Sequence, residues 1–220
     1  MAKLKNGKFN NTASSTLKQF FLIVTVFISL GARSQDNLYL KVHFLYGSKP
    51  LKKYKSTEAK WFGGILGGHA GIESDSNKIL SFSPSGKFHW IAKDKERHSK
   101  YTIKSEKAFY SILGGHPDSV KKAVVYIPIT PEQKKIFDSI SSCYLKESPY
   151  DYAFIGMRCG AATYEILSQL GIAREYSNGT ISRKVFYPKK LRKPLLKEAE
   201  LNGWKVERQN GSIRRKWEKD

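Results

Sequence analysis

Two residues of the sequence, Cys159 and His69, have the chemistry and the surroundings that acyl transfer requires. Cys159 begins a predicted helix that runs to about Leu170 and is closed by Gly171. A thiol attacks a carbonyl carbon as its thiolate, and the positive end of a helix dipole lowers the pKa of a thiol. The first helical turn also offers free backbone N–H groups for a tetrahedral oxyanion. We therefore expect Cys159 to be a nucleophile with a lowered pKa.

His69 is the most suitable base for this nucleophile among the five histidines of the chain. It begins a predicted strand directly after a glycine-rich segment whose last residue, Gly68, leaves room for a substrate. His43 and His89 lie within predicted strands and are alternative bases. We expect Ser81, across a predicted hairpin from His69, to orient the imidazole, although a hydroxyl does so less firmly than a carboxylate.

The same residues also have structural explanations. A cysteine at a helix start is more often a small buried core residue than a nucleophile. Tyr152, in the aromatic loop before Cys159, could line a substrate cleft, but core packing is the commoner use of such a residue. Cys143 is expected on the buried face of a helix with Ile136 and Ile140. A disulfide between Cys143 and Cys159 is an alternative that would remove the nucleophile.

The pattern around these residues predicts an α+β domain, in which an antiparallel sheet of about four to six strands packs against the helix that carries Cys159. A turn at 74–77 joins strands 69–73 and 78–83 into a hairpin, and a strand at 87–92 extends it into a meander. Thr130, Pro131 and Gln133 are typical of a helix start, and this helix should run to about Lys146. The other predicted elements are strands 38–46 and 122–129, a basic helix at 188–201 and a hairpin at 204–217 around Asn210-Gly211.

The first 34 residues have the layout of a secretory signal peptide. Four lysines and no acidic residue precede an apolar run at 20–32. This run is about 13 residues long, whereas a membrane-spanning helix needs roughly 20. Ala32 and Ser34 fit a cleavage site before Gln35. We expect residues 1–34 to be removed and residues 35–220 to form a single secreted domain, periplasmic or extracellular.

The chain is strongly basic, with 39 Lys and Arg residues against 19 Asp and Glu residues. Such a charge attracts anionic partners, and we expect an anionic envelope polymer or a membrane surface. The export signal argues against nucleic acid as a partner. The glycine-rich segment 61–68 lacks the Gly-Lys-Ser/Thr ending of a phosphate-binding loop. We expect no cofactor and no metal.

The order of these motifs resembles that of the permuted papain-like proteins. The resemblance rests on His69-Ala-Gly-Ile72, on a hairpin ending Ile79-Leu-Ser-Phe-Ser-Pro84, and much later on Arg158-Cys-Gly-Ala-Ala-Thr-Tyr-Glu-Ile-Leu167. It covers roughly residues 64–171, about half of the chain. These proteins include the lecithin:retinol acyltransferase family and bacterial relatives of the NlpC-type cell-wall peptidases. In them the strand with the histidine precedes the helix with the cysteine, the reverse of papain.

The resemblance implies a circularly permuted papain-like fold, with Cys159 as nucleophile and His69 as base. Ser81 falls where the acyltransferases carry a second histidine, and this departure weakens the expected triad. The function that we expect is a secreted cysteine hydrolase acting on an amide or peptide bond of the cell envelope through a thioester. The alternatives are an inactive binding module for an anionic envelope polymer, and a lipid acyltransferase or thioesterase acting on an acyl ester.

Overall fold

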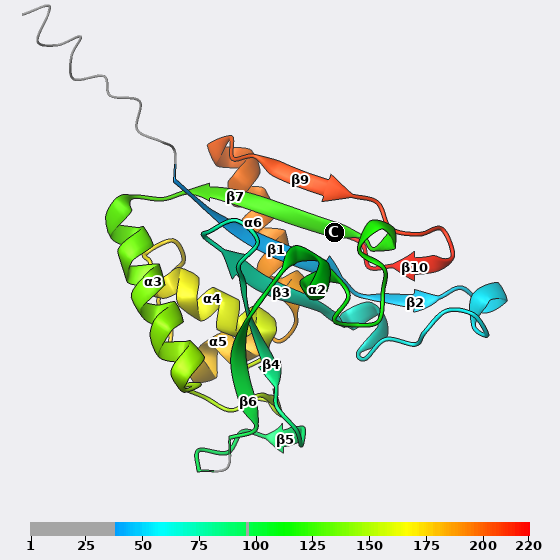
Figure 1. Ribbon diagram of the computed structural model, residues 1–220, viewed down its shortest axis with the longest axis horizontal. Coiled ribbons are helices and arrows are strands. Elements are labelled where there is room, and N and C mark those ends of the chain that lie inside the picture. The colour runs from blue at the N-terminus through cyan, green and yellow to red at the C-terminus, as the bar shows by residue number, and fades with distance from the viewer. Residues whose placement is uncertain (1–37, 96) are drawn as a thin grey trace, which may run out of the picture. The chain divides into compact units, whose positions relative to one another are not determined.

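The computed structural model describes residues 38–95 and 97–220, so the predicted signal peptide at 1–34 lies outside the described residues. Within these ranges the architecture is α+β, with one antiparallel sheet of six strands in the order β6-β4-β3-β1-β7-β9 (Figure 1). The strands of this sheet are β1 (Tyr39–Tyr46), β3 (Gly68–Glu73), β4 (Ile79–Pro84), β6 (Ser99–Lys104), β7 (Lys122–Pro128) and β9 (Val206–Gln209). Two short pairs complete the strands: β2 (Ser48–Pro50) with β10 (Arg215–Trp217), and β5 (His89–Ile91) with β8 (Ala153–Ile155).

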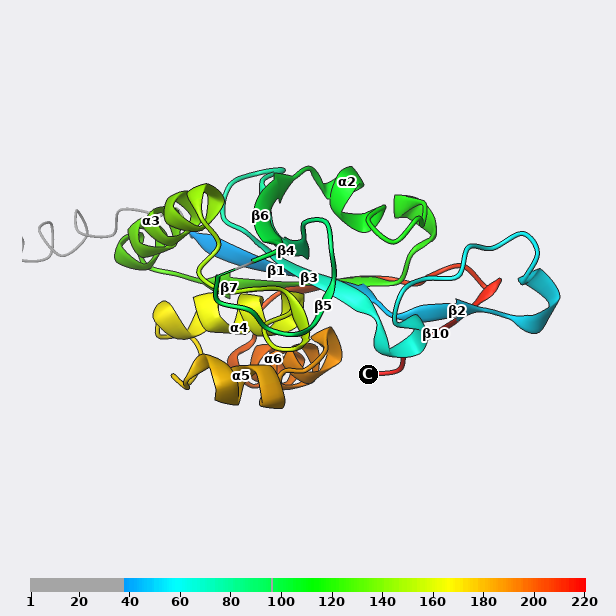
Figure 2. The ribbon, with the colours of Figure 1, turned by 90° about the horizontal axis from the view of Figure 1, so that it is seen from below.

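Helices cover both faces of the sheet (Figure 2). Helices α4 (Cys159–Gln169), α5 (Asn178–Lys184) and α6 (Pro188–Asn202) lie on one face, and the short α2 (Glu106–Tyr110) lies on the other. The remaining helix, α3 (Pro131–Lys146), packs near β6 at the end of the sheet order. Every helix of the described residues is too short or too polar to cross a membrane.

Strand β1 shows how the sequence pattern assigns side chains to the two faces. Leu40, Val42 and Phe44 are buried in the core that α4 and α6 share, whereas Leu45 belongs to a second core with Phe109 of α2. Because side chains alternate along a strand, His43 lies on the α2 face, where it contacts Phe109 and Tyr110. Both faces of β1 are largely buried, which explains why apolar residues occupy most positions on both.

Two predicted helices are confirmed closely. Helix α3 spans Pro131–Lys146 and has a complete capping box, in which the Thr130 hydroxyl accepts from the Gln133 N–H and the Gln133 side chain accepts from the Thr130 N–H. Helix α4 begins at Cys159, and Gly171 follows it in the left-handed conformation with a φ of 70°. The predicted buried face of α3 is correct at Ile140 but wrong at Ile136 and Cys143, which are exposed, while Phe137 is buried instead.

The predicted meander is wrong in its third strand. Strand β5 pairs in parallel with β8, and the strand beside β4 is β6, with Lys100 opposite Ser83. Strand β6 was not among the predicted strands; its lysines at 100 and 104 face one side, while Tyr101 between them is buried on the other. The predicted hairpin at 204–217 is also wrong, since β9 pairs with β7 and β10 pairs with β2. Gly211 is needed there for packing, because a Cβ at this position would overlap the indole of Trp217.

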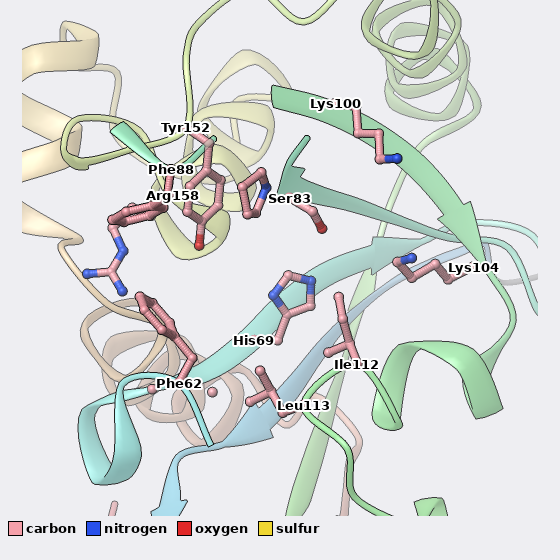
Figure 3. Close-up of a pocket in the computed structure, with 13 residues that line it drawn as sticks. Phe62, His69, Ser83, Phe88, Lys100, Lys104, Ile112, Leu113, Tyr152 and Arg158 are labelled. Atoms are coloured by element: carbon pink, nitrogen blue, oxygen red, sulfur yellow. The ribbon is translucent and has the colours of Figure 1, made fainter. Parts of the chain in front are cut away.

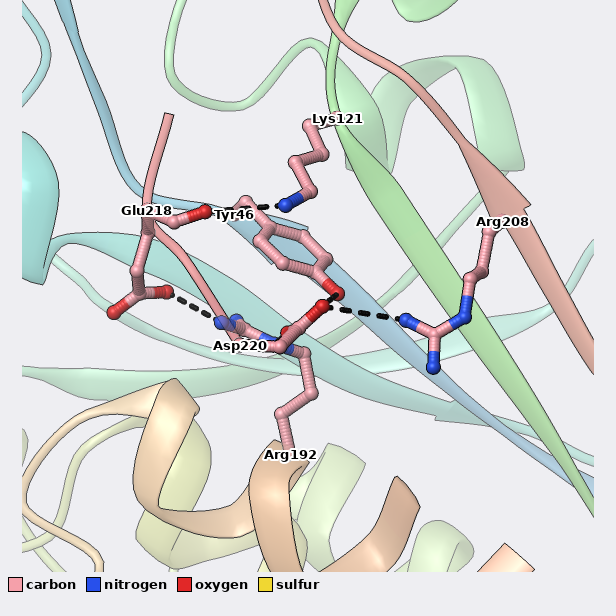
Figure 4. A network of polar contacts seen from close by, with 6 residues as sticks. All are labelled: Tyr46, Lys121, Arg192, Arg208, Glu218 and Asp220. Carbon is pink, nitrogen blue, oxygen red and sulfur yellow. Dashed lines mark hydrogen bonds and ion pairs between the residues drawn. The ribbon is translucent and has the colours of Figure 1, made fainter. Parts of the chain in front are cut away.

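A buried arginine fixes the last residues of the chain to helix α6 and strand β1 (Figure 4). The Arg192 guanidinium is fully buried and lies 3.6 Å from the ring centroid of Tyr46. Its Nη2 donates to Glu218 at 2.7 Å and its Nε donates to Asp220 at 2.9 Å. The Tyr46 hydroxyl also donates to Asp220. We call Tyr46, Arg192, Glu218 and Asp220 the C-terminal clasp.

Candidate active site

A cavity of about 470 Å³ opens beside the beginning of β3 (Figure 3). Its apolar wall consists of Phe62, Pro84, Phe88, Ile112 and Leu113. Its polar lining consists of His69, Ser83, Lys100, Lys104, Tyr152 and Arg158. Two glycines, Gly67 and Gly68, complete the lining, so both residues that the sequence predicted for substrate contact, Gly68 and Tyr152, line the cavity. The size and the mostly apolar lining are typical of a small-molecule site.

His69 is held rigidly at the edge of this cavity. Its Nε2 forms a 2.6 Å hydrogen bond with the Ser81 hydroxyl, which leaves Nδ1 available to a reaction partner. Its ring packs against Phe109 of α2 with a centroid separation of 5.1 Å. Gly71 makes this possible, because a Cβ there would lie 2.8 Å from Cε2 of Phe109. The side chain is therefore fixed by a polar contact and by packing.

Ser81 does not lie directly across the hairpin from His69, where the sequence predicted it. Ile72 lies opposite Leu80 and Glu73 opposite Ile79, so an extended ladder would place Ser83 opposite His69. Ser81 instead reaches His69 diagonally, on the face that both share. The proximity of Ser81 and His69 was predicted correctly, although the register was not.

Burial lowers the pKa of His69 to about 3, and the positive charge of Lys104 acts in the same direction. Only 5% of His69 is exposed to solvent. The imidazole is consequently neutral at pH 7. In this state one ring nitrogen carries a proton, and the other can accept one.

Cys159 lies where β3 and β4 separate. The ladder between these strands covers only Ile72 and Glu73 on β3, so the N–H of Ala70 is free of β4. This N–H and the N–H of Gly160 interact with the Cys159 sulfur. The nitrogen of Ala70 is bonded to the carbonyl carbon of His69. The Cys159 sulfur therefore lies next to the peptide bond that joins His69 to Ala70.

The thiol and the imidazole approach the sheet from different sides. Cys159 belongs to α4, whereas the His69 ring packs on α2, which covers the opposite face (Figure 2). No hydrogen bond or ion pair joins the two groups in the part of the chain that the structure describes. The thiol is also buried, with 3% of the residue exposed.

The expected lowering of the Cys159 pKa is wrong. Burial raises the pKa of the thiol, and this effect exceeds the opposing effects of the Ala70 N–H, the Arg158 charge, the Gly160 N–H and the Tyr152 hydroxyl. The sequence identified the helix start correctly but could not show how completely the thiol is enclosed. The resting site therefore contains a neutral thiol and a neutral imidazole.

Tyr152 connects the thiol to the cavity. Its ring packs against Phe82 and Phe88, and its hydroxyl interacts with Cys159 and with Arg158. Burial raises the pKa of Tyr152, so its hydroxyl keeps its proton and can donate a hydrogen bond. Movement of the Tyr152 ring would uncover the sulfur to a ligand in the cavity.

Arg158 is a candidate residue that sequence reasoning missed. It lines the cavity, and its guanidinium stacks over the ring of Phe186 at 4.9 Å. Only 8% of the residue is exposed. Its Nε has no hydrogen-bond partner among the described residues. Its position directly before Cys159 was the signal in the sequence that could have identified it.

The two alternative bases serve structural roles instead. Nδ1 of His89 donates to the Asp151 carboxylate at 2.6 Å, which anchors the loop that carries Tyr152. Burial alone would raise the pKa of Asp151. The hydrogen bond from His89, followed by those from the backbone N–H groups of His98 and Lys93, holds this pKa below its usual value. His43 contacts Tyr110 at 2.9 Å and Glu73 at 3.1 Å on the α2 face.

Cys143 and Cys159 are both free thiols, so the alternative disulfide is not formed. Within residues 38–95 and 97–220, no group of three or more His, Cys, Asp or Glu side chains is arranged to hold a metal ion. Comparison with protein-family models, curated proteins and solved structures gives no significant match.

Proposed function

We propose that this protein is a cysteine hydrolase of the permuted papain-like type that cleaves an amide or peptide bond, with the cell envelope as the source of its substrate. The observation that carries this proposal is the position of the Cys159 sulfur. It lies at the N-terminus of α4, beside the His69–Ala70 peptide and behind a cavity lined by His69 and Tyr152. The order of the histidine strand and the cysteine helix in the chain also supports it.

The reaction would begin with a proton transfer. For this step the thiol and the imidazole, which approach the sheet from different sides, must come within hydrogen-bond reach through a rearrangement at the start of β3. The Cys159 thiol then gives its proton to Nδ1 of His69, while Nε2–H donates to Ser81 and keeps the ring oriented. The sulfur then forms a bond with the carbonyl carbon of the substrate. N–H groups at the start of α4 and the Tyr152 hydroxyl are the nearest donors for the oxyanion.

Two further steps complete the turnover. The carbon–nitrogen bond of the substrate breaks, and His69 returns the proton to the leaving amine, which leaves a thioester on Cys159. Water then attacks the thioester as His69 takes one of its protons, and the carbon–sulfur bond breaks. The proton on His69 returns to Cys159, so one amide and one water give one acid and one amine.

Acylation of the full chain by p-nitrophenyl acetate tests this proposal, with the modified cysteine located by mass spectrometry. Cys159 should become acetylated, and the His69→Gln variant should react about 10²-fold to 10⁴-fold more slowly, the usual contribution of a general base. Cys143→Ser is the matched control, because Cys143 is the exposed thiol on α3. Modification confined to Cys143, or a Cys159 rate that His69→Gln leaves unchanged, would contradict the proposal.

A second candidate is a binding module without catalysis. It is favoured by the two pKa shifts, since burial stabilises the neutral forms of both Cys159 and His69 and so opposes the ion pair that activates a thiol. In this case the cavity would bind its ligand while Cys159 remained unacylated in the same experiment.

A further inference from the structure

The polar groups of the cavity are unevenly distributed. Lys100 and Lys104 lie on one side of His69, and Arg158 lies on the other (Figure 3). No carboxylate of the described residues forms an ion pair with any of these three side chains. A cavity that presents unpaired cations over an otherwise apolar wall is suited to a ligand with both apolar and anionic parts.

The two lysines of β6 project from the same face of the sheet as two unpartnered hydroxyls, one on β4 and one on β6. Lys100 lies opposite Ser83 and Thr102 lies opposite Ser81, so these side chains project from the same side of the sheet as His69. The hydroxyl oxygens of Ser83 and Thr102 are buried and have no hydrogen-bond partner among the described residues. A buried hydroxyl without a partner is destabilising, which a bound anion near Ser83 would relieve.

The proposed reaction determines which part of the substrate lies next to His69. A general acid gives its proton to the leaving group, so the leaving part of the substrate must lie against the His69 ring. Lys104 is close enough to His69 for its charge to act on the ring, and Ser83 lines the same end of the cavity. The groups that would meet an anion therefore lie on the leaving-group side.

We propose that Lys100, Lys104 and Ser83 form an anion subsite for the leaving group, so that the preferred substrate is an amide whose leaving amine carries a carboxylate or a phosphoryl group. This inference names the substrate class and rests on the proposed function. For a peptide, the bond cleaved is then the one next to a free C-terminal carboxylate. The apolar wall formed by Phe62, Phe88 and Leu113 receives the acyl side.

Binding to the full-length Cys159→Ala variant tests the subsite without chemistry. The probes are acetyl-Phe-Ala with a free carboxylate, the same peptide as its C-terminal amide, and its analogue ending in a phosphonate, each measured by isothermal titration calorimetry. The carboxylate peptide should bind about tenfold or more tightly than the amide, as charge-assisted hydrogen bonds imply. The Lys104→Gln and Lys100→Gln substitutions should each reduce this preference, whereas Lys107→Gln, an exposed lysine on α2 outside the cavity, should retain it.

The outcomes separate the subsite from the proposed catalysis. Equal affinity for carboxylate and amide, or no binding of either, would overturn the subsite, and a preference for the phosphonate would assign it to phosphoryl ligands. Cleavage of acetyl-Phe-Ala and of its amide is then measured with Cys159 present. A binding preference without Cys159-dependent cleavage refutes the hydrolase but retains the subsite, whereas equal cleavage of both peptides refutes the subsite but retains the hydrolase.

Discussion

The depressed pKa of His69 predicts a specific dependence of stability on pH. In the folded protein burial, together with the charge of Lys104, lowers this pKa from 6.5 to about 3. The unfolded chain therefore binds a proton to this ring below pH 6.5, while the folded protein does not. Stability from this group is present above pH 6.5 and is lost as the pH falls toward about 3.

The size of the effect follows from the pKa difference. At pH 5 the unfolded imidazole is 1.5 pH units below its pKa of 6.5, and each unit corresponds to about 1.4 kcal/mol, so His69 should reduce the free energy of unfolding by about 2 kcal/mol. Because the ring is 5% exposed, solvent screening reduces this value little. Lys100 and Lys104 line the same cavity from β6, and the Cys159 thiol, whose pKa burial raises, stays neutral throughout this interval.

The assay is urea unfolding of wild type and of His69→Asn at pH 7.5 and pH 5. Wild type should lose about 2 kcal/mol more than the variant between these two pH values, because asparagine does not titrate and all other groups are common to both proteins. His116→Asn is the control, since the His116 side chain is 70% exposed, and its pH dependence should match that of wild type. An equal loss in wild type and His69→Asn would refute the reasoning.

The other predictions concern stability and can be checked from the denaturant midpoint of unfolding. Arg192→Met should lower the free energy of unfolding by about 3–5 kcal/mol because it leaves the Glu218 carboxylate buried without its partner. Adding Glu218→Leu should regain most of this stability. Lys193→Met, on the exposed side of the same helix, should change the stability by less than about 0.5 kcal/mol. Gly71→Ala should cost about 1–3 kcal/mol, since the new methyl group would press on the α2 face. Thr130→Ala should cost about 1 kcal/mol through loss of the helix cap, and an unchanged midpoint would contradict the capping role.

The elements that the sequence predicted well are those governed by local interactions. The start of α3 is encoded within four residues, because the cap hydroxyl and the N3 amide are neighbours in the chain. The turn after Glu73 likewise depends on adjacent polar residues, with Asn77 at a φ of 61°. Such signals do not depend on the rest of the fold.

The elements that were predicted wrongly depend on distant partners. Asn210-Gly211 is a strong local signal for a hairpin, but Arg215 donates to Ser48, 167 residues away, and this pairing draws β10 to β2. The burial of Cys143 was misjudged because the apolar residues of α3 allow two overlapping faces, and only contact with the sheet decides between them.

In the candidate site too, the features that depend on local sequence could be predicted and those that depend on distant contacts could not. The proximity of His69 and Ser81 could be predicted, since a short turn joins their strands. The pKa shifts could not, because they arise from enclosure by α2, α4 and the loop of Tyr152. Lys100 and Lys104 were overlooked since lysines in a charged stretch usually face solvent, and only the pairing of β6 with β4 turns them toward the cavity.

The separation of β3 from β4 has a consequence for how this protein can vary. The sulfur of Cys159 is positioned by main-chain amides, those of Ala70 and Gly160, which every amino acid except proline possesses. Substitutions in the cavity wall can therefore change which molecules fit without displacing the sulfur. The position of the Cys159 sulfur and the ligand preference of the cavity can thus diverge independently among descendants of this chain.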